Sequence, residues 1–397
     1  MKQLILTTLL LLTITPCLRA QKKEIAQARS YVKSGKDLDK AEQLLCGLLE
    51  RDSASRQNPK VHALLFRTIH KQYEAGNEKL YLGQHYDTTS IFNITRRLFL
   101  VAERFDSLDA RPDRKGRVRP DYRSNHAAVL HQIRRNLYLG GRFFLSHNSA
   151  AEAFSFFDTY LDCARQPLFT DYHYAERDTF MVEAAYWACY AGLREGQPLH
   201  ILKYADLALQ DTAKASFTLQ YVAEAYSSLA DSARYEQTLL EGFRRYPEHA
   251  YFYPRLLDFY NARRQFDEAL LLAKSALQVN PLSELFLFGC STVLLNMGRN
   301  QESLDVSRQL IGLNNTLPEP YFNAATALLN QIAPLENNPR KNRAMIRSIY
   351  EEARPYMERY RKLAPAQQQK WAPALYKIYL NLNMGRQFDE IDKLLKK

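Results

Sequence analysis

Glycine and proline are scarce in this chain of 397 residues, which contains 14 and 16 of them respectively. Folds built of many short strands need these residues at their turns, so the scarcity argues against an all-β architecture. Tryptophan is rare as well, at two residues, although 46% of the chain is hydrophobic and 24% is charged. The composition therefore favours a mostly helical globular protein that can bury a core.

Long apolar runs are missing except near the start of the chain. Leu4–Ile14 is apolar apart from threonines, follows a single positive charge, and is followed by a small residue at Ala20. This pattern is typical of a cleavable secretory signal and is too short to span a bilayer. We therefore predict a signal over residues 1–20, an exported periplasmic protein and no transmembrane segment. Lipidation of Cys17 is the alternative, but Pro16 stands where a lipoprotein signal has Gly, Ala or Ser.

Cysteine is too dispersed to indicate a metal site. The four cysteines that follow the signal form no C-x-x-C pair and have no histidine partner at zinc-finger spacing: Cys46, Cys163, Cys189 and Cys290. We expect buried free thiols, and a disulfide between Cys163 and Cys189 is the alternative in an exported protein. The motifs G-x-S-x-G, H-E-x-x-H and G-x-x-x-x-G-K are also missing. The prediction is a protein without cofactor, metal ion or enzymatic activity, although a catalytic cleft needs no such motif.

Positive charge is unevenly distributed in a chain whose net charge is +11. Arg96–Arg142 alone holds twelve Lys and Arg against five Asp and Glu. Within it, Arg111–Pro120 has prolines, a glycine and no apolar periodicity, which predicts a loop. The cluster is either a solvated basic face or a site for an acidic partner, and export argues against nucleic acid. The candidate binding residues of this loop are Arg114, Lys115, Arg117 and Arg119.

Short segments recur in the second half of the chain. Arg264–Glu268 recurs unchanged as Arg386–Glu390, and Leu295–Gly298 recurs as Leu382–Gly385. A further recurrence, with a period of about 34 residues, joins the set Leu256, Tyr260, Ala269 and Ala276 to the set Cys290, Leu294, Ser303 and Leu310. A fixed period of this length indicates stacked helical hairpins.

These residues resemble the tetratricopeptide repeat, which places small residues where two antiparallel helices cross and large ones between repeats. Less complete matches extend the resemblance over residues 126–397, including a unit with a first helix over Tyr321–Gln331 and a second over Tyr350–Pro365. Residues 21–125 are expected to hold atypical helical repeats, with the basic loop near 111–120. The resemblance implies an all-α protein, an α-solenoid forming a right-handed superhelix of about nine antiparallel hairpins.

The atypical repeats are expected to begin with a hairpin of Ile25–Val32 and Leu38–Leu49. Two longer helices follow in the prediction, over Val61–Tyr73 and Ile91–Phe105, because their apolar residues recur at helical spacing. They carry no clean repeat motif, so their place in the array rests on periodicity alone.

The resemblance also implies where a partner binds. First helices of such hairpins line a concave groove that holds an extended peptide or a partner helix. By the family's positions, the candidates that face this groove are Gln220, Glu224, Ser227, Asp258, Asn261, Thr292, Asn296, Tyr376 and Asn383. One asparagine recurs near the ends of three first helices, as Asn296, Asn330 and Asn383. Either these amides contact a peptide backbone, or asparagine merely suits the end of a helix.

The predicted function is a non-catalytic scaffold that binds a protein or peptide through the concave groove, the basic loop or both, and that can join an envelope complex. Two alternatives stay open. Some exported carbohydrate-capture proteins use this helical frame with aromatic platforms on loops, and Tyr172–Tyr174 is an aromatic cluster between Pro167 and Asp178. The second is an all-helical polysaccharide hydrolase or lyase, whose paired carboxylates no sequence spacing reveals.

Overall fold

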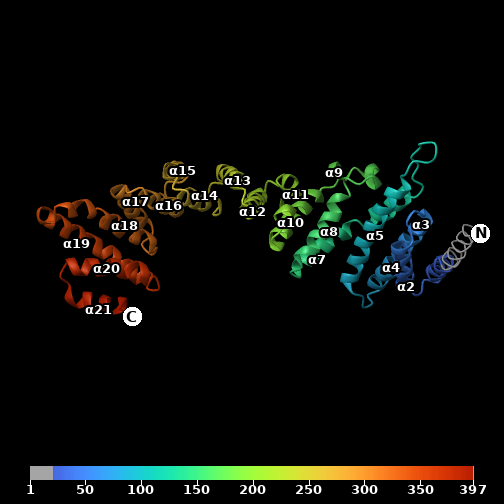
Figure 1. Ribbon diagram of the computed structural model, residues 1–397, viewed down its shortest axis with the longest axis horizontal. Helices are drawn as coiled ribbons and strands as arrows, with labels where there is room; N and C mark the ends of the chain where they lie inside the picture. The colour runs from blue at the N-terminus through green and yellow to red at the C-terminus, as the bar shows by residue number, and fades with distance from the viewer. Residues whose placement is uncertain (1–20, 397) are drawn as a thin grey trace, which may run out of the picture. The chain divides into compact units, whose positions relative to one another are not determined.

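A computed structural model describes residues 21–396, so the predicted signal, its cleavage site and Cys17 lie outside the described residues. The described residues form α-helices and two short 3₁₀ helices joined by turns, and no strand occurs among them, as Figure 1 shows. This confirms the all-α prediction. The chain divides into two compact units, unit 1 (Met1–Ala230) and unit 2 (Asp231–Lys397). Among the helices described, none is both long and apolar enough to cross a membrane.

Unit 1 is built of helices that pack as hairpins with their neighbours in the chain. The helix over 21–34 and the next one share a core through Ala28, Val32, Ala41 and Leu45, and α4 packs on α5, α7 on α8, and α10 on α11. After 21–34 the elements are α2 (Leu38–Arg51), α3 (Ser53–Arg56), α4 (Pro59–Tyr81), α5 (Thr88–Asp109), α6 (Arg123–Ile133), α7 (Arg135–Ser146), α8 (Ala150–Asp162), η1 (Pro167–Tyr172), α9 (Tyr174–Arg177), α10 (Phe180–Glu195), α11 (Pro198–Ala208) and α12 (Ala215–Ser228).

Unit 2 begins with a single helix and continues as hairpins. After α13, α14 packs on α15, α16 on α17, α18 on α19, and α20 on α21. The elements are α13 (Ser232–Arg245), α14 (Phe252–Ala262), α15 (Phe266–Val279), α16 (Glu284–Asn296), α17 (Asn300–Leu313), α18 (Glu319–Asn330), η2 (Ala333–Asn337), α19 (Pro339–Leu363), α20 (Gln368–Asn381) and α21 (Gly385–Leu395). In the described residues the two units hold eight such hairpins, against about nine expected. The remaining one would consist of α12 and α13, which belong to different units. The domain boundary at residue 125 stays a prediction.

A left-handed residue marks the turn before several second helices and reveals the repeat period. Gly196, Ala230, Arg264 and Gly298 have φ of 71°, 55°, 57° and 73°, and each stands two residues before a second helix. The interval from each of these residues to the next is the same, and it equals the predicted period. The left-handed conformation ends one helix and lets the chain reverse, which suits glycine without requiring it. The regular period therefore begins earlier in the chain than the recurrence near Leu256 indicates.

The same turns correct the predicted alignment of the asparagines. Asn296 and Asn330 are the last residues of α16 and α18, so they are equivalent. Asn383 has φ of 57° and stands two residues before α21, which is the place of Gly298. The identical segments around Leu295 and Leu382 are thus offset by two residues in the fold. The residue that ends α20 is Asn381.

Small residues lie where the helices of a hairpin cross, as predicted. Ala269 and Ala276 on α15 are fully buried, as are Ser303 and Leu310 at the equivalent positions of α17. Ser303 Oγ donates a hydrogen bond of 2.8 Å to the carbonyl oxygen of Ser291 across the α16–α17 hairpin. Glycine serves the same purpose between repeats, because a Cβ on Gly289 would lie 2.4 Å from the Tyr253 hydroxyl oxygen.

The second helix of one predicted hairpin is longer than expected. The helix expected from Tyr350 begins at Pro339, so α19 has 25 residues and the preceding connection is short and partly 3₁₀. Proline at the first position of α19 lacks the N–H that a helix start leaves unpaired, so it initiates this helix.

In residues 21–396 all four cysteines are free thiols, three buried and Cys46 half-buried, and the alternative of a Cys163–Cys189 disulfide is not formed.

Candidate functional site

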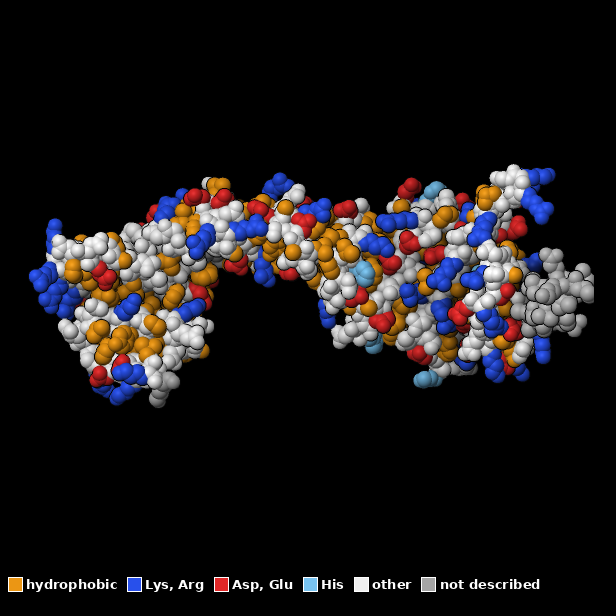
Figure 2. Space-filling model, in the orientation of Figure 1, with side chains coloured by type: hydrophobic (Ala, Val, Ile, Leu, Met, Phe, Trp, Pro, Cys, Tyr) orange, Lys and Arg blue, Asp and Glu red, His pale blue; other side chains and the backbone are white. Residues whose placement is uncertain are grey.

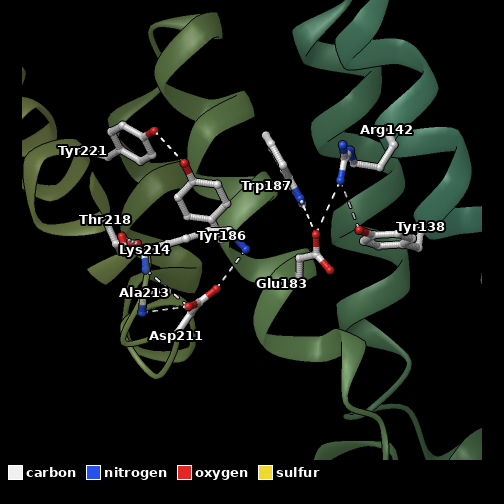
Figure 3. A network of polar contacts seen from close by, with 10 residues as sticks. All are labelled: Tyr138, Arg142, Glu183, Tyr186, Trp187, Asp211, Ala213, Lys214, Thr218 and Tyr221. Carbon is white, nitrogen blue, oxygen red and sulfur yellow. Dashed lines mark hydrogen bonds and ion pairs between the residues drawn. The ribbon is translucent and has the colours of Figure 1, made fainter. Parts of the chain in front are cut away.

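The first helices of unit 1 present a cluster of aromatic and charged side chains, which we call the Trp187 cluster: Tyr138, Arg142, Glu183 and Trp187. The Arg142 guanidinium lies 4.2 Å from the centre of the Trp187 ring. Glu183 Oε1 accepts a hydrogen bond of 3.1 Å from Trp187 Nε1 and lies 3.5 Å from Arg142 Nη1. Arg142 Nη1 also donates to the Tyr138 hydroxyl at 3.3 Å, and Figure 3 shows these contacts.

Helical spacing places these four side chains together. Tyr138 and Arg142 are four residues apart on α7, as are Glu183 and Trp187 on α10, so each pair shares one helix face. α10 packs against α7, which brings the two faces into contact, and α10 also packs against α12. Burial raises the pKa of the Tyr138 hydroxyl, which therefore stays protonated at neutral pH.

The same surface continues onto α12. The hydroxyl oxygens of Tyr186 and Tyr221 lie 3.1 Å apart, and the Tyr190 ring packs against Tyr221 in a tilted arrangement with 6.0 Å between ring centres. Lys214 Nζ lies 3.0 Å from Asp211 Oδ2 and 5.2 Å from the centre of the Tyr186 ring (Figure 3). This hydrogen bond holds the pKa of the Asp211 carboxyl below its usual range.

The Trp187 cluster is suited to binding because it is ordered yet accessible. The side chains of Arg142 and Glu183 remain 44% and 33% exposed. A cation held over an indole ring is already oriented, so a ligand that contacts it loses little additional side-chain entropy on binding. Tryptophan, tyrosine and arginine are also the residues that contribute most binding energy at protein interfaces.

The first helices of unit 2 border a separate groove of about 890 Å³. Its lining comes mainly from α18, η2 and α20, with further contributions from Gly298, Asn300 on α17 and Tyr350 on α19, and Asn330 and Asn381 are among the polar residues. Asn330 Nδ2 lies 3.4 Å from Asn300 Oδ1, and Lys370 Nζ lies 5.7 Å from the centre of the Phe322 ring. The groove thus offers amides, ammonium groups and an aromatic face to one ligand.

The structure brings only some of the predicted groove residues together. Asn296 Nδ2 donates to Asn261 Oδ1 at 3.2 Å, so these two amides pair across neighbouring first helices. Asn330 lies in the unit 2 groove, whereas Asn383 lies in a turn because of its left-handed backbone. The remaining candidates are spread over different first helices: Gln220, Glu224 and Ser227 on α12, Asp258 on α14, Thr292 on α16 and Tyr376 on α20. Ser227 and Asp258 are exposed and the other four are half-buried.

The basic loop lies between α5 and α6 and is held by Asp113. The Asp113 carboxylate accepts hydrogen bonds from the backbone N–H groups of Lys115 and Arg117 at 2.8 and 3.0 Å. It also pairs with the Arg117 guanidinium at 2.8 Å, and these hydrogen bonds lower its pKa. Arg114, Lys115 and Arg119 are exposed, and Figure 2 shows the Lys and Arg side chains at the tip of this loop.

The aromatic cluster of the Pro167–Asp178 connection packs against the protein. Tyr174 is buried and its hydroxyl lies 2.9 Å from His131 Nδ1, while the Tyr172 ring stacks on His131 at 4.3 Å. The Arg134 guanidinium lies 3.8 Å from the ring centres of both Tyr160 and Tyr174. These contacts account for the aromatics as packing, and they leave the Tyr174 ring no free face for a sugar.

Within residues 21–396, no group of three His, Cys, Asp or Glu side chains is placed to hold a metal ion.

Sequence reasoning missed the Trp187 cluster because its two pairs come from separate helices, α7 and α10, with other elements between them in the chain. The sequence pattern that could have indicated the cluster is a pair of four-residue spacings, Tyr138 to Arg142 and Glu183 to Trp187, each of which joins an aromatic residue to a charged one.

Comparisons with known proteins return helical-repeat structures. No protein-family model matches the chain, and no curated protein matches it. The C-terminal part of a TPR repeat-containing protein from Cytophaga hutchinsonii is similar at 11% identity and a TM-score of 0.45, over 64% of this chain and 92% of that one. MamA from Desulfovibrio magneticus RS-1, residues 41 to the end, is similar at 13% identity and a TM-score of 0.34, over 47% and 96%.

The chain's own hairpins identify its fold more directly. Buried small residues occupy the helix crossings, four turns follow one another at equal spacing, and each unit is a stack of hairpins. Together with the length of that spacing, these are the properties of the tetratricopeptide repeat. The described chain is therefore an all-helical protein with the fold of the tetratricopeptide repeats.

Proposed function

We propose that this protein is a non-catalytic scaffold that binds a protein or peptide partner on its first-helix face. The observation that carries the proposal is the Trp187 cluster, an ordered but accessible group of aromatic and charged side chains. Such a surface gives an interface its anchoring residues, with the flanking polar groups providing orientation. The unit 2 groove with Asn330 and the basic loop are secondary contacts in this proposal.

A photocrosslinking amino acid tests which surface meets the partner. It replaces Tyr190, which is half-buried beside Trp187, or Val118 in the basic loop, which is 55% exposed. Leu199 on the second helix α11, 67% exposed, is the matched control. We expect one protein to crosslink from Tyr190 in stoichiometric amounts and none from Leu199. A partner that crosslinks from neither Tyr190 nor Val118, or equally from all three positions, would overturn the proposal.

We also propose that the protein acts outside the cytoplasm, in the periplasm, where it can join an envelope complex. The support is the apolar stretch Leu4–Ile14 with Ala20 after it. Mass measurement of the protein from its native cells should then find Gln21 as the first residue. An intact Met1 would contradict export, and an acylated Cys17 would contradict cleavage after Ala20.

The crosslinking experiment also separates the alternatives. Capture of an envelope polysaccharide in place of a protein would favour a glycan-binding role. Turnover of that polysaccharide by the purified protein would favour a hydrolase or lyase. Either result would contradict the scaffold proposal.

A further inference from the structure

Unit 2 has a second groove, which lies between the second helices α13 and α15 and not along the first helices. Both helices pack against α14, whose Tyr260 contributes to the lining, and they leave about 940 Å³ between them. Leu240 and Phe243 line it from α13, and Leu271 and Leu272 line it from α15. The groove is separate from every surface assigned above.

The groove exposes more apolar surface than its place in the fold explains. The exposed fractions are 42% for Leu240, 72% for Leu271 and 53% for Val279. Burying apolar surface is worth about 25 cal/mol per Å², so leaving several such side chains in water forgoes stabilisation. Contiguous exposed apolar patches mark interaction sites.

The next repeat provides an internal comparison. The turn residues Ala230, Arg264 and Gly298 recur at the repeat period and so define equivalent positions in successive hairpins. Leu240 on α13 therefore corresponds to Lys274 on α15, and Leu271 on α15 corresponds to Asp305 on α17. Lys274 and Asp305 are exposed at the same positions. The hairpin stack does not require leucine there, so the apolar groove is a property of this pair of helices.

The charges at the rim indicate the kind of partner. Glu236, Glu241 and Glu268 line the groove, against one lining cation, Arg244. Glu241 also pairs with Arg245 at 2.9 Å, so Glu236 and Glu268 contribute most of the negative charge. Glu236 accepts a hydrogen bond of 3.0 Å from the Tyr260 hydroxyl, which fixes its carboxylate beside the floor. The rim is therefore acidic around an apolar floor.

We propose that the α13–α15 groove binds an amphipathic helix of a partner protein, with an apolar stripe flanked by Lys and Arg. The lining residues span 233–244 on α13 and 268–279 on α15, about 16 Å on each helix at 1.5 Å per residue. That length accommodates about three turns. Leucines of the partner at positions i, i+3 or i+4 and i+7 would contact Leu240 and Leu271, and its cations would face the rim carboxylates.

Binding of a synthetic helical peptide to the full chain tests the proposal. The probe is a fluorescent Leu/Lys peptide of about 18 residues, long enough to form a helix, with leucines at helical spacing. Its scrambled isomer and a Leu/Glu counterpart are the comparison peptides. The groove variant is Leu240→Lys/Leu271→Asp, which installs the residues found one repeat further on. The control variant Leu285→Lys/Leu313→Asp makes the same changes at leucines that are 37% and 45% exposed outside the groove.

We expect fluorescence anisotropy to show the Leu/Lys peptide binding at least tenfold more tightly than either comparison peptide. The groove variant should lose this preference and the control variant should keep it, with unchanged circular dichroism in both. Equal affinity for the scrambled peptide, or equal affinity of the two variants, would overturn the proposal. A dimer in light scattering that dissociates only in the groove variant would also overturn it, because a second copy would then occupy the groove.

Discussion

Individual helical glycines in unit 2 differ in whether a methyl group fits. Gly289 on α16 faces Tyr253 and Leu257, and a Cβ there would lie 2.4 Å and 2.5 Å from their nearest atoms. Gly312 on α17 has nothing within 4 Å of a Cβ. The pair therefore separates the effect of packing from that of helix propensity.

Gly289→Ala should lower the free energy of unfolding by about 1–3 kcal/mol through overpacking. Gly312→Ala should leave it unchanged or raise it by up to about 1 kcal/mol, because alanine favours the helix. Urea denaturation of the two variants measures the difference. Equal effects would show that α16 does not approach α14 as closely as described.

Glu103 on α5 is a second residue whose environment predicts behaviour. Burial, with Asp162 and Asp158 nearby, raises its pKa to about 7, and its Oε1 is buried without a hydrogen-bond partner. The folded protein therefore keeps this proton to higher pH than the unfolded chain. Stability that is present below about pH 4.5 is lost as the pH rises through 7.

Glu103→Gln removes this loss. The free energy of unfolding of the variant minus that of the wild type should be about 2 kcal/mol larger at pH 8 than at pH 5. Urea denaturation of both proteins at the two pH values measures this change. The pKa of His126 is lowered to about 4 by burial and gives the opposite slope, but it is present in both proteins and cancels. Parallel pH profiles would contradict the prediction.

At the scale of elements, one of the four candidate binding residues of the basic loop is held by an ion pair, and the other three are exposed. Arg117 closes the loop with Asp113, so it is retained in the test. Replacing Arg114, Lys115 and Arg119 by Ser should weaken capture of the crosslinked partner and flatten its dependence on salt, since exposed charges are screened beyond about 10 Å at 0.1 M. Thermal stability should hardly change.

Replacing Arg340, Lys341 and Arg343 on α19 by Ser removes the same charge from exposed positions in the other unit and is the control for the loop. If both triple variants weaken capture equally, the contact is not with the loop.

Helices were predictable where apolar residues recur at helical spacing, with or without small residues at the crossing positions. The opening hairpin, the helices around Val61 and Ile91 and the buried Ala269 agree with the prediction. Turn register was not predictable, because glycine, alanine, arginine and asparagine all adopt the left-handed conformation here. The identical sequence segments around Asn296 and Asn383 therefore occupy different positions in their repeats. The Trp187 cluster and the α13–α15 groove depend on packing between helices, which spacing within one segment does not encode.

At the scale of the whole molecule, each unit carries its own fluorescent reporter. Trp187 lies in unit 1 and is half-buried, whereas Trp371 lies in unit 2 and is 4% exposed. In a repeat protein, contacts run mainly between neighbours, so damage in one repeat spreads only partly. The two indoles can therefore distinguish local from global unfolding.

Ala269→Leu overpacks the α14–α15 hairpin and should destabilise it by about 1–3 kcal/mol. In single-tryptophan proteins made with Trp187→Phe or Trp371→Phe, the urea midpoint reported by Trp371 should fall by more than that reported by Trp187. Lys274→Leu, at an exposed position of the same helix, is the control. Equal shifts at the two indoles would mean that the chain unfolds as a single cooperative whole.

The equal spacing of the turns at Arg264 and Gly298 makes the chain modular in length. Deleting residues 265–298 joins one left-handed turn to the start of the next second helix, so α14 would pair with α17. Such a shortened protein should keep the same helical circular dichroism per residue, whereas a deletion of half that length, residues 265–281, removes α15 alone, leaves α14 without its partner helix and should not. The number of hairpins in unit 2 is thus adjustable by whole repeats, which gives the protein a ready route to lengthen or shorten its binding surface.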